Sequence, residues 1–83
     1  MTESEDQNLH AWYEFLMKDD SERVIGFQTQ GTTPFILIVK MYSKRKGGSP
    51  FRFLFSGCII RNYYCTIHDI FKDEVIGGEI DVE

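Results

Sequence analysis

The sequence is poor in the side chains that hold metal ions or build disulfide frameworks. Its 83 residues include two cysteines, Cys58 and Cys65, and two histidines, His10 and His68. Structural zinc sites usually take four ligands from these residue types, and small secreted domains are usually rich in disulfides. We therefore expect no metal and no other cofactor. We also expect both thiols to be reduced, as in an intracellular protein of the cytoplasm or nucleus.

Long apolar runs are also lacking. The longest covers residues 35–39, whereas a membrane-spanning helix needs roughly 20 apolar residues. The first six residues carry three acids, where a secretory signal would begin with basic residues. The sequence thus predicts no membrane segment, no secretory signal and no membrane partner.

Motifs for catalysis are missing as well. The glycine pairs at residues 47–48 and 77–78 lack the spacing and the Lys-Ser/Thr sequence of a phosphate-binding loop. Cys65 and His68 are the residue types of a nucleophile and its base, but three positions apart on a predicted strand they point to opposite faces. We therefore expect no catalytic residues and no enzymatic activity.

Acidic side chains are absent from the middle of the chain. Residues 24–68 hold six bases and no acid, whereas the segments on either side each carry a net charge of −5. Two interpretations stay open. The acidic ends fold back beside the middle segment and neutralise it, or the basic run at residues 44–46 forms a tip that meets an anion or an acidic partner.

The apolar pattern near the N-terminus predicts a helix over residues 6–18. Five large apolar residues fall at i, i+3, i+4, i+7 and i+8: Leu9, Trp12, Tyr13, Leu16 and Met17. This spacing places them in one stripe along a helix. We expect Trp12 and Leu16 to be buried against a sheet.

From residue 22 onward the pattern is typical of strands. Aromatic and β-branched residues between turn signals predict strands over residues 22–29, 35–43, 51–60, 63–71 and 75–82. Because the connections are short, neighbouring strands should pair antiparallel. The predicted fold class is α+β, an N-terminal amphipathic helix packed on a four- to five-stranded antiparallel β-meander that could curl towards a barrel. Residues 1–83 make a single domain in this prediction, and residues 1–5 form a disordered acidic N-terminus.

The predicted sheet carries large apolar residues on both faces, and one helix covers only one of them. The second face must close into a barrel, pack on another chain or stay exposed, and large exposed apolar patches usually mark interaction sites. We therefore interpret the protein as a non-enzymatic interaction module. It would act as an inhibitor, adaptor or small subunit that docks on a larger protein, or as a homodimer.

The predicted contact set combines the basic loop with aromatic and basic residues of the adjoining strands. Its members are Lys44, Arg45, Lys46, Phe51, Arg52, Phe53, Arg61 and Tyr64. Aromatic side chains and arginine are enriched in protein interfaces. Basic grooves lined with aromatic side chains also hold single-stranded nucleic acid, so a nucleic-acid-binding module is the alternative prediction.

Overall fold

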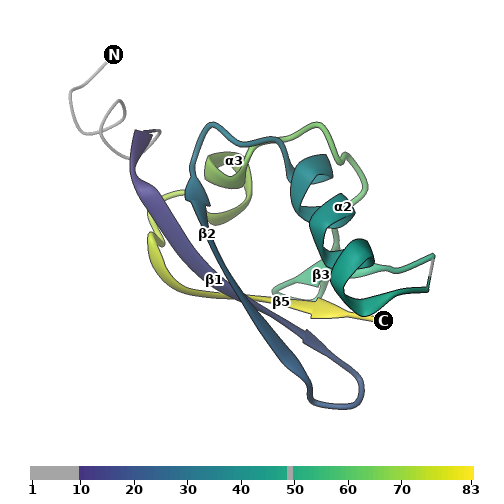
Figure 1. The fold of residues 1–83 in the computed structure, drawn as a ribbon. Coiled ribbons are helices and arrows are strands. Elements are labelled where there is room, and N and C mark those ends of the chain that lie inside the picture. Colours follow the sequence, from purple (N-terminus) through teal and green to yellow (C-terminus); the bar gives the residue numbers. More distant parts are fainter. Residues whose placement is uncertain (1–9, 49) are drawn as a thin grey trace.

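Five strands and two helices follow one another in the computed structural model, which describes residues 10–48 and 50–83. The elements in chain order are β1 (Trp12–Asp19), β2 (Val24–Gln30), α2 (Phe35–Lys46), β3 (Phe53–Phe55), β4 (Cys58–Ile59), α3 (Ile67–Phe71) and β5 (Ile76–Val82). The strands form one sheet in the order β2-β1-β5-β3-β4, and both helices lie on the same side of it (Figure 1).

The class α+β is confirmed, but the predicted arrangement is wrong in three respects. The one helix longer than two turns among the described residues is α2, in the middle of the chain rather than at its start. The sheet is mixed rather than an antiparallel meander, because β1 and β5 pair in parallel at its centre. The sheet is open rather than curled into a barrel, since β2 and β4 are its two edges. The predicted disordered segment 1–5 and the start of the predicted helix, residues 6–9, lie outside the described residues.

From Trp12 onward, the segment predicted as the first helix is the strand β1. Tyr13, Phe15 and Met17 alternate into the interior, while the side chains of Trp12 and Leu16 are 57% and 44% exposed. The prediction that Trp12 and Leu16 are buried is therefore wrong. The segment fits both the helical and the strand period. Pairing with β2 on one side and β5 on the other satisfies its backbone and selects the strand.

The segment predicted as the strongest strand is the helix α2. Its rich supply of β-branched residues favours a strand locally. Yet Phe35, Ile38 and Tyr42 fall at i, i+3 and i+7, and these are the side chains that α2 buries. The burial of this stripe against the sheet outweighs the local preference, which is a weak one.

Both ends of α2 carry helix-terminating features. Pro34 precedes the first turn in an extended conformation, and Gly47 follows the last turn at a φ of 75°. Three consecutive basic residues occupy the last turn, where the helix dipole favours positive charge. The first two amide groups of α2 donate hydrogen bonds of 2.7 Å to the carbonyl oxygens of Cys65 and Tyr63, so a distant loop caps the helix.

Residues 51–60 are a tight hairpin rather than one strand. β3 and β4 pair through Phe55 and Cys58, which leaves Ser56 and Gly57 as a two-residue turn. Both turn residues have positive φ, at 52° and 80°. This is the geometry that a two-residue hairpin of the commonest type requires.

Residues 63–71 are a loop and the short helix α3 rather than a strand. α3 begins at a capping box, in which Thr66 and Asp69 bond each other's backbone amide groups. Cys58 therefore lies on the edge strand β4, whereas Cys65 lies in the loop before α3. Both cysteines are free.

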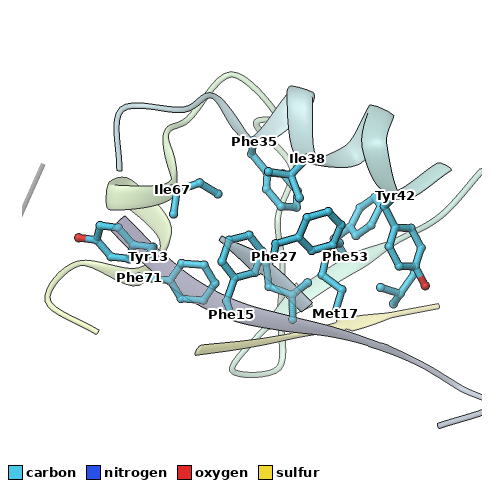
Figure 2. Close-up of a cluster of buried hydrophobic side chains, with 12 residues drawn as sticks. Tyr13, Phe15, Met17, Phe27, Phe35, Ile38, Tyr42, Phe53, Ile67 and Phe71 are labelled. Atoms are coloured by element: carbon cyan, nitrogen blue, oxygen red, sulfur yellow. The ribbon is translucent and has the colours of Figure 1, made fainter. Parts of the chain in front are cut away.

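The core lies between the sheet and the two helices. Its buried members are Tyr13, Phe15, Met17, Phe27, Phe35, Ile38, Tyr42, Phe53, Ile67, Phe71, Ile80 and Val82. Figure 2 shows Phe35 and Ile38 pointing down from α2 towards Phe15 and Met17 on the sheet. Aromatic rings make much of the contact, with ring centroids 4.9 Å apart for Phe15 and Phe71. Such ring pairs add stabilisation beyond that of area burial.

The sheet thus has an inner face, towards α2 and α3, and an outer face on the opposite side. The predicted surplus of apolar residues arose because residues 35–43 were counted as a strand. As a helix they cover the inner face instead of enlarging the sheet. None of the helices in the described ranges is long and apolar enough to cross a membrane.

Candidate functional site

One edge of the sheet presents unpaired backbone along a seven-residue strand. Among the described residues, β2 pairs with β1 on one side and with no strand on the other. The Asp19 amide donates a hydrogen bond to the Arg23 carbonyl oxygen, and the Gly31 amide donates one to the Ala11 carbonyl oxygen. Odd-numbered residues along β2 therefore turn their backbone groups towards β1. The backbone groups of Val24, Gly26 and Gln28, between these inward-bonded positions, therefore point to the open edge.

The sequence of this edge does not protect it. Natural sheets guard exposed edges with lysine, proline, bulges or very short strands. β2 contains no charged residue and no proline, its pairing with β1 is regular, and it is seven residues long. The opposite edge, β4, is only two residues long. Of the two edges, β2 is the one on which another strand can form a ladder.

A groove lies beside this edge, between β2 and the C-terminal half of α2. We call it the edge groove. Its volume is about 450 Å³, and it is lined by Asp19, Arg23, Val24, Ile25, Tyr42, Arg45 and Lys46. Ile25 is half-buried and Val24 is exposed, while Tyr42 closes the floor from the helix side. The groove therefore combines an apolar floor with charged walls.

The one acid of the edge groove is already bound. Asp19 is almost fully buried, and its carboxylate accepts hydrogen bonds of 2.9 Å from the amide groups of Ser21 and Arg23 and a further bond from the Lys46 ammonium. The hydrogen bond from Lys46 is the largest cause that lowers the pKa of Asp19. The same bond raises the pKa of Lys46. This ion pair ties the end of β1 to the end of α2 and fixes that wall of the groove.

The remaining charge in the groove is positive. Arg45 is exposed and lies over the ring of Phe27, with Cζ 5.6 Å from the ring centroid. Arg23 is exposed directly before β2. With the carboxylate of Asp19 neutralised by Lys46, two arginines are left to attract an anion. The edge groove is therefore suited to an extended segment that carries both apolar and acidic side chains.

No cluster of three or more His, Cys, Asp or Glu side chains in the described part of the chain could hold a metal ion. No family model matches the chain, and no curated protein matches it. The geometry of the edge groove is therefore the main support for a function.

The structure places the eight residues of the predicted contact set in different surroundings. Arg45 and Lys46 line the edge groove, and Lys44 is exposed on α2 beside them. Phe53 is 1% exposed and belongs to the core, so its side chain has no surface to offer a partner. Phe51 is half-buried, with its ring centroid 5.4 Å from that of Tyr42.

The other three lie apart from the groove. Arg52 is exposed, and its backbone exchanges two hydrogen bonds with Glu83. Arg61 and Tyr64 are exposed in the loop between β4 and α3, and this loop caps the start of α2. The start and end of a 12-residue helix are about 18 Å apart. The structure thus separates these two residues from the basic end of α2. Partner binding by the eight residues stays a prediction.

Sequence reasoning found the basic half of the edge groove and missed its apolar half. Arg45 and Lys46 stood out as part of a basic run. Ile25 and Tyr42 did not, because their meeting depends on α2 being a helix that crosses beside β2. The available signal was the order of Pro34, the basic run and Gly47, which marks the start and stop of a helix.

Proposed function

We propose that the protein is a non-enzymatic interaction module that binds an extended segment of a larger protein along β2. The observation that carries this proposal is the open edge of β2 beside a groove with an apolar floor and two exposed arginines, Arg23 and Arg45. Main-chain hydrogen bonds to Val24, Gly26 and Gln28 would supply affinity, as in other cases of strand addition. Such a module would act as an inhibitor, adaptor or small subunit. The two unpaired thiols support an intracellular setting.

The groove also supports a choice of ligand chemistry. Side chains alternate along an added strand, so every second residue would face Ile25 and Tyr42 on the groove side. Acidic side chains beside the first half of β2 would face Arg23, which precedes the strand, and Arg45, which lies over Phe27. We therefore propose a segment of about five residues with apolar side chains in alternate positions and two or three acids at one end.

Pairing of β2 with a second copy of itself has less support. Two antiparallel copies of β2 pair along their whole length when Phe27 of one copy lies opposite Phe27 of the other. Each Arg45 lies over the Phe27 of its own chain, so both would lie close to the symmetry axis. The two guanidinium groups would then meet on the same side of the sheet, and like charges in such positions cost free energy. Nucleic-acid binding has less support too. Phe53 is buried and Phe51 packs against Tyr42, so neither offers a free face for stacking.

A peptide titration tests the proposal. The probe is a fluorescein-labelled peptide of alternating valines followed by three glutamates, with a peptide of the same composition in scrambled order as its control. We expect saturable binding of the ordered peptide, with amide chemical-shift changes concentrated at Val24, Gly26 and Gln28. A labelled oligothymidylate serves as the competing probe. Tighter binding of the oligothymidylate, or equal binding of the ordered and scrambled peptides, would contradict the proposal.

Two charge-reversal variants at neighbouring residues of α2 test whether the peptide binds in the edge groove. Arg45→Glu should weaken the peptide roughly tenfold, or about 1.4 kcal/mol, because it turns an attractive wall of the groove into a repulsive one. Lys44→Glu changes the net charge by the same amount on the adjacent exposed residue, which does not line the groove. We expect a much smaller effect from Lys44→Glu. Equal losses in the two variants would show only non-specific attraction.

A further inference from the structure

The outer face of the sheet holds a second hollow, which shares no lining residue with the edge groove. It lies over β1, β2 and β5, has a volume of about 380 Å³, and opens between Leu16, Gly26 and Ile76. Gly26 contributes no side chain, and Gly77 beside Ile76 belongs to an irregular stretch where the pairing register of β1 and β5 shifts. The side chain of Ile76 is 75% exposed at the rim. The hollow thus has an apolar rim that neither helix covers.

The charge around this hollow is negative. Glu14 lines it directly. On β5, Glu79 pairs with Leu16 and Asp81 pairs with Lys18, and both acids are exposed. Lys18 is the one base among the four charged residues named here, and the other three are acids. The outer face therefore presents apolar side chains among mostly acidic ones.

The surface of α2 that points away from the sheet has the opposite character. Leu37 and Met41 are 47% and 45% exposed, one turn apart. Lys40 and Lys44 are exposed beside them, also one turn apart. The sequence of α2 contains no acid. These four residues fall within about 100° around the helix axis, given 3.6 residues per turn. They form one apolar and basic strip, which we call the outer strip of α2.

The two surfaces match in spacing as well as in charge. Lys40 and Lys44 are about 6 Å apart along the helix. Glu79 and Asp81 are two residues apart on a strand, or about 6.6 Å. The apolar pair of the outer strip can lie over the hollow while the two lysines reach the two acids. Each surface therefore offers what the other lacks.

We propose that the outer strip of α2 in one copy of the chain docks on the outer face of the sheet in a second copy. α2 lies on the inner side of the sheet, so the two surfaces are on opposite sides of the molecule (Figure 1). A contact between different surfaces of identical chains closes only where the rotation between copies completes a ring, and with the two surfaces on opposite sides of the molecule we expect it to stay open. It repeats head to tail into open chains. One short helix makes a small contact, so association is weak and depends on concentration.

Two complementary variants test this self-association. The helix variant, Leu37→Ser with Met41→Ser, removes the apolar half of the outer strip. The sheet variant, Glu79→Lys with Asp81→Lys, reverses the charge of the outer face. All four residues are exposed, so both variants should keep the fold, which an amide correlation spectrum checks. A control variant, Arg61→Glu with Glu74→Lys, alters exposed charges that belong to neither surface.

Sedimentation velocity from about 10 μM to about 1 mM gives the outcome, since contacts of this size form in that range. The average mass of the unaltered protein and of the control variant should rise above 9.7 kDa with no fixed upper limit. Each test variant alone should stay monomeric. An equimolar mixture should form a species of twice the monomer mass and nothing larger, because only one intact surface of each kind remains.

Three results would overturn the proposal. The unaltered protein could stay at the monomer mass over the whole range. It could stop at a dimer, which would indicate a symmetric contact instead. The mixture of the two test variants could fail to associate, which would show that these two surfaces do not meet.

Discussion

The inner and outer faces of the sheet show how one strand serves two purposes. On β1, Phe15 and Met17 are fully buried in the aromatic core, while Trp12 and Leu16 on the other side are about half exposed. The two pairs of residues are similarly apolar. They differ in the face of the sheet on which their side chains lie, because side chains alternate between the faces along a strand. The inner face fixes the fold, because its rings interlock with those of the helices. The outer face keeps apolar side chains that the described part of the chain leaves exposed, and exposed apolar patches are the kind of surface for which we propose a partner.

Truncation of two neighbouring side chains on β1 should give the largest difference between the two faces. Phe15→Ala should lower the free energy of unfolding by about 3–5 kcal/mol, because the ring packs against Phe27 and Phe71 and would leave a cavity. This is a large part of the stability of a domain of this size. Leu16→Ala should cost about 1 kcal/mol or less, since the side chain is nearly half exposed. Urea unfolding at equilibrium measures both, and similar losses would contradict the division into two faces.

The sequence allowed the class and several strands to be predicted, but not the arrangement. β2 and β5 were expected within two residues of where they lie. The segment of β1 has Trp12, Tyr13, Leu16 and Met17, which suit a helix, and also Tyr13, Phe15 and Met17, which suit a strand. Period alone does not decide between them. The partners of β1 decide, and they come from β2 and from β5, about 60 residues further along the chain.

The candidate site was less predictable than the fold. A run of three basic residues was visible in the sequence, and two of them do line the edge groove. The groove depends on the open backbone of β2 and on Tyr42 of α2 and Ile25 of β2 lining the same hollow. The order of the strands decides which strand lies at an edge. That order results from the parallel pairing of β1 with β5, which lie near opposite ends of the chain. Local composition carries no signal for it.

A second comparison between the faces uses glycine. A Cβ atom on Gly78, which is buried on the inner side, would lie 2.5 Å from Cε1 of Phe71. Gly78→Ala should therefore cost about 1–3 kcal/mol through overpacking. A Cβ on Gly26 would meet Leu16 at an ordinary 3.6 Å on the outer face. Gly26→Ala should be neutral or gain up to about 1 kcal/mol, because alanine restricts the unfolded chain more than glycine does.

Thermal and urea unfolding of the two glycine variants measures the change in stability that each substitution causes. Replacing Phe71 by leucine in the Gly78→Ala background sharpens the test, since a smaller side chain should recover part of the loss. Equal stabilities of Gly78→Ala and Gly26→Ala would show that the ring of Phe71 moves aside at little cost. The inner face would then be less tightly packed than its ring contacts suggest.

The smallest effect that we expect is the pH dependence of stability that comes from Asp19, a charged residue on the inner face. Asp19 continues the buried row of Phe15 and Met17, but it is a carboxylate. The hydrogen bond from Lys46, with those from two backbone amide groups, lowers its pKa. A pKa lowered by folding means that the native state binds fewer protons than the unfolded state. Asp19 therefore contributes stability above the unfolded pKa of about 3.9, and this contribution is lost as the pH falls through the folded value.

The free energy of unfolding should thus fall below about pH 4 more steeply in the unaltered protein than in Asp19→Asn, which has no carboxylate to protonate at this position. Asp20→Asn changes the exposed neighbour and should keep the slope of the unaltered protein. Urea titrations between about pH 2.5 and about pH 7 give the slopes. If Asp19→Asn and the unaltered protein lose stability in parallel, the bond to Lys46 does not hold the carboxylate in its charged form. The edge groove would then keep a free acid, and the preference for acidic segments at that wall would be lost.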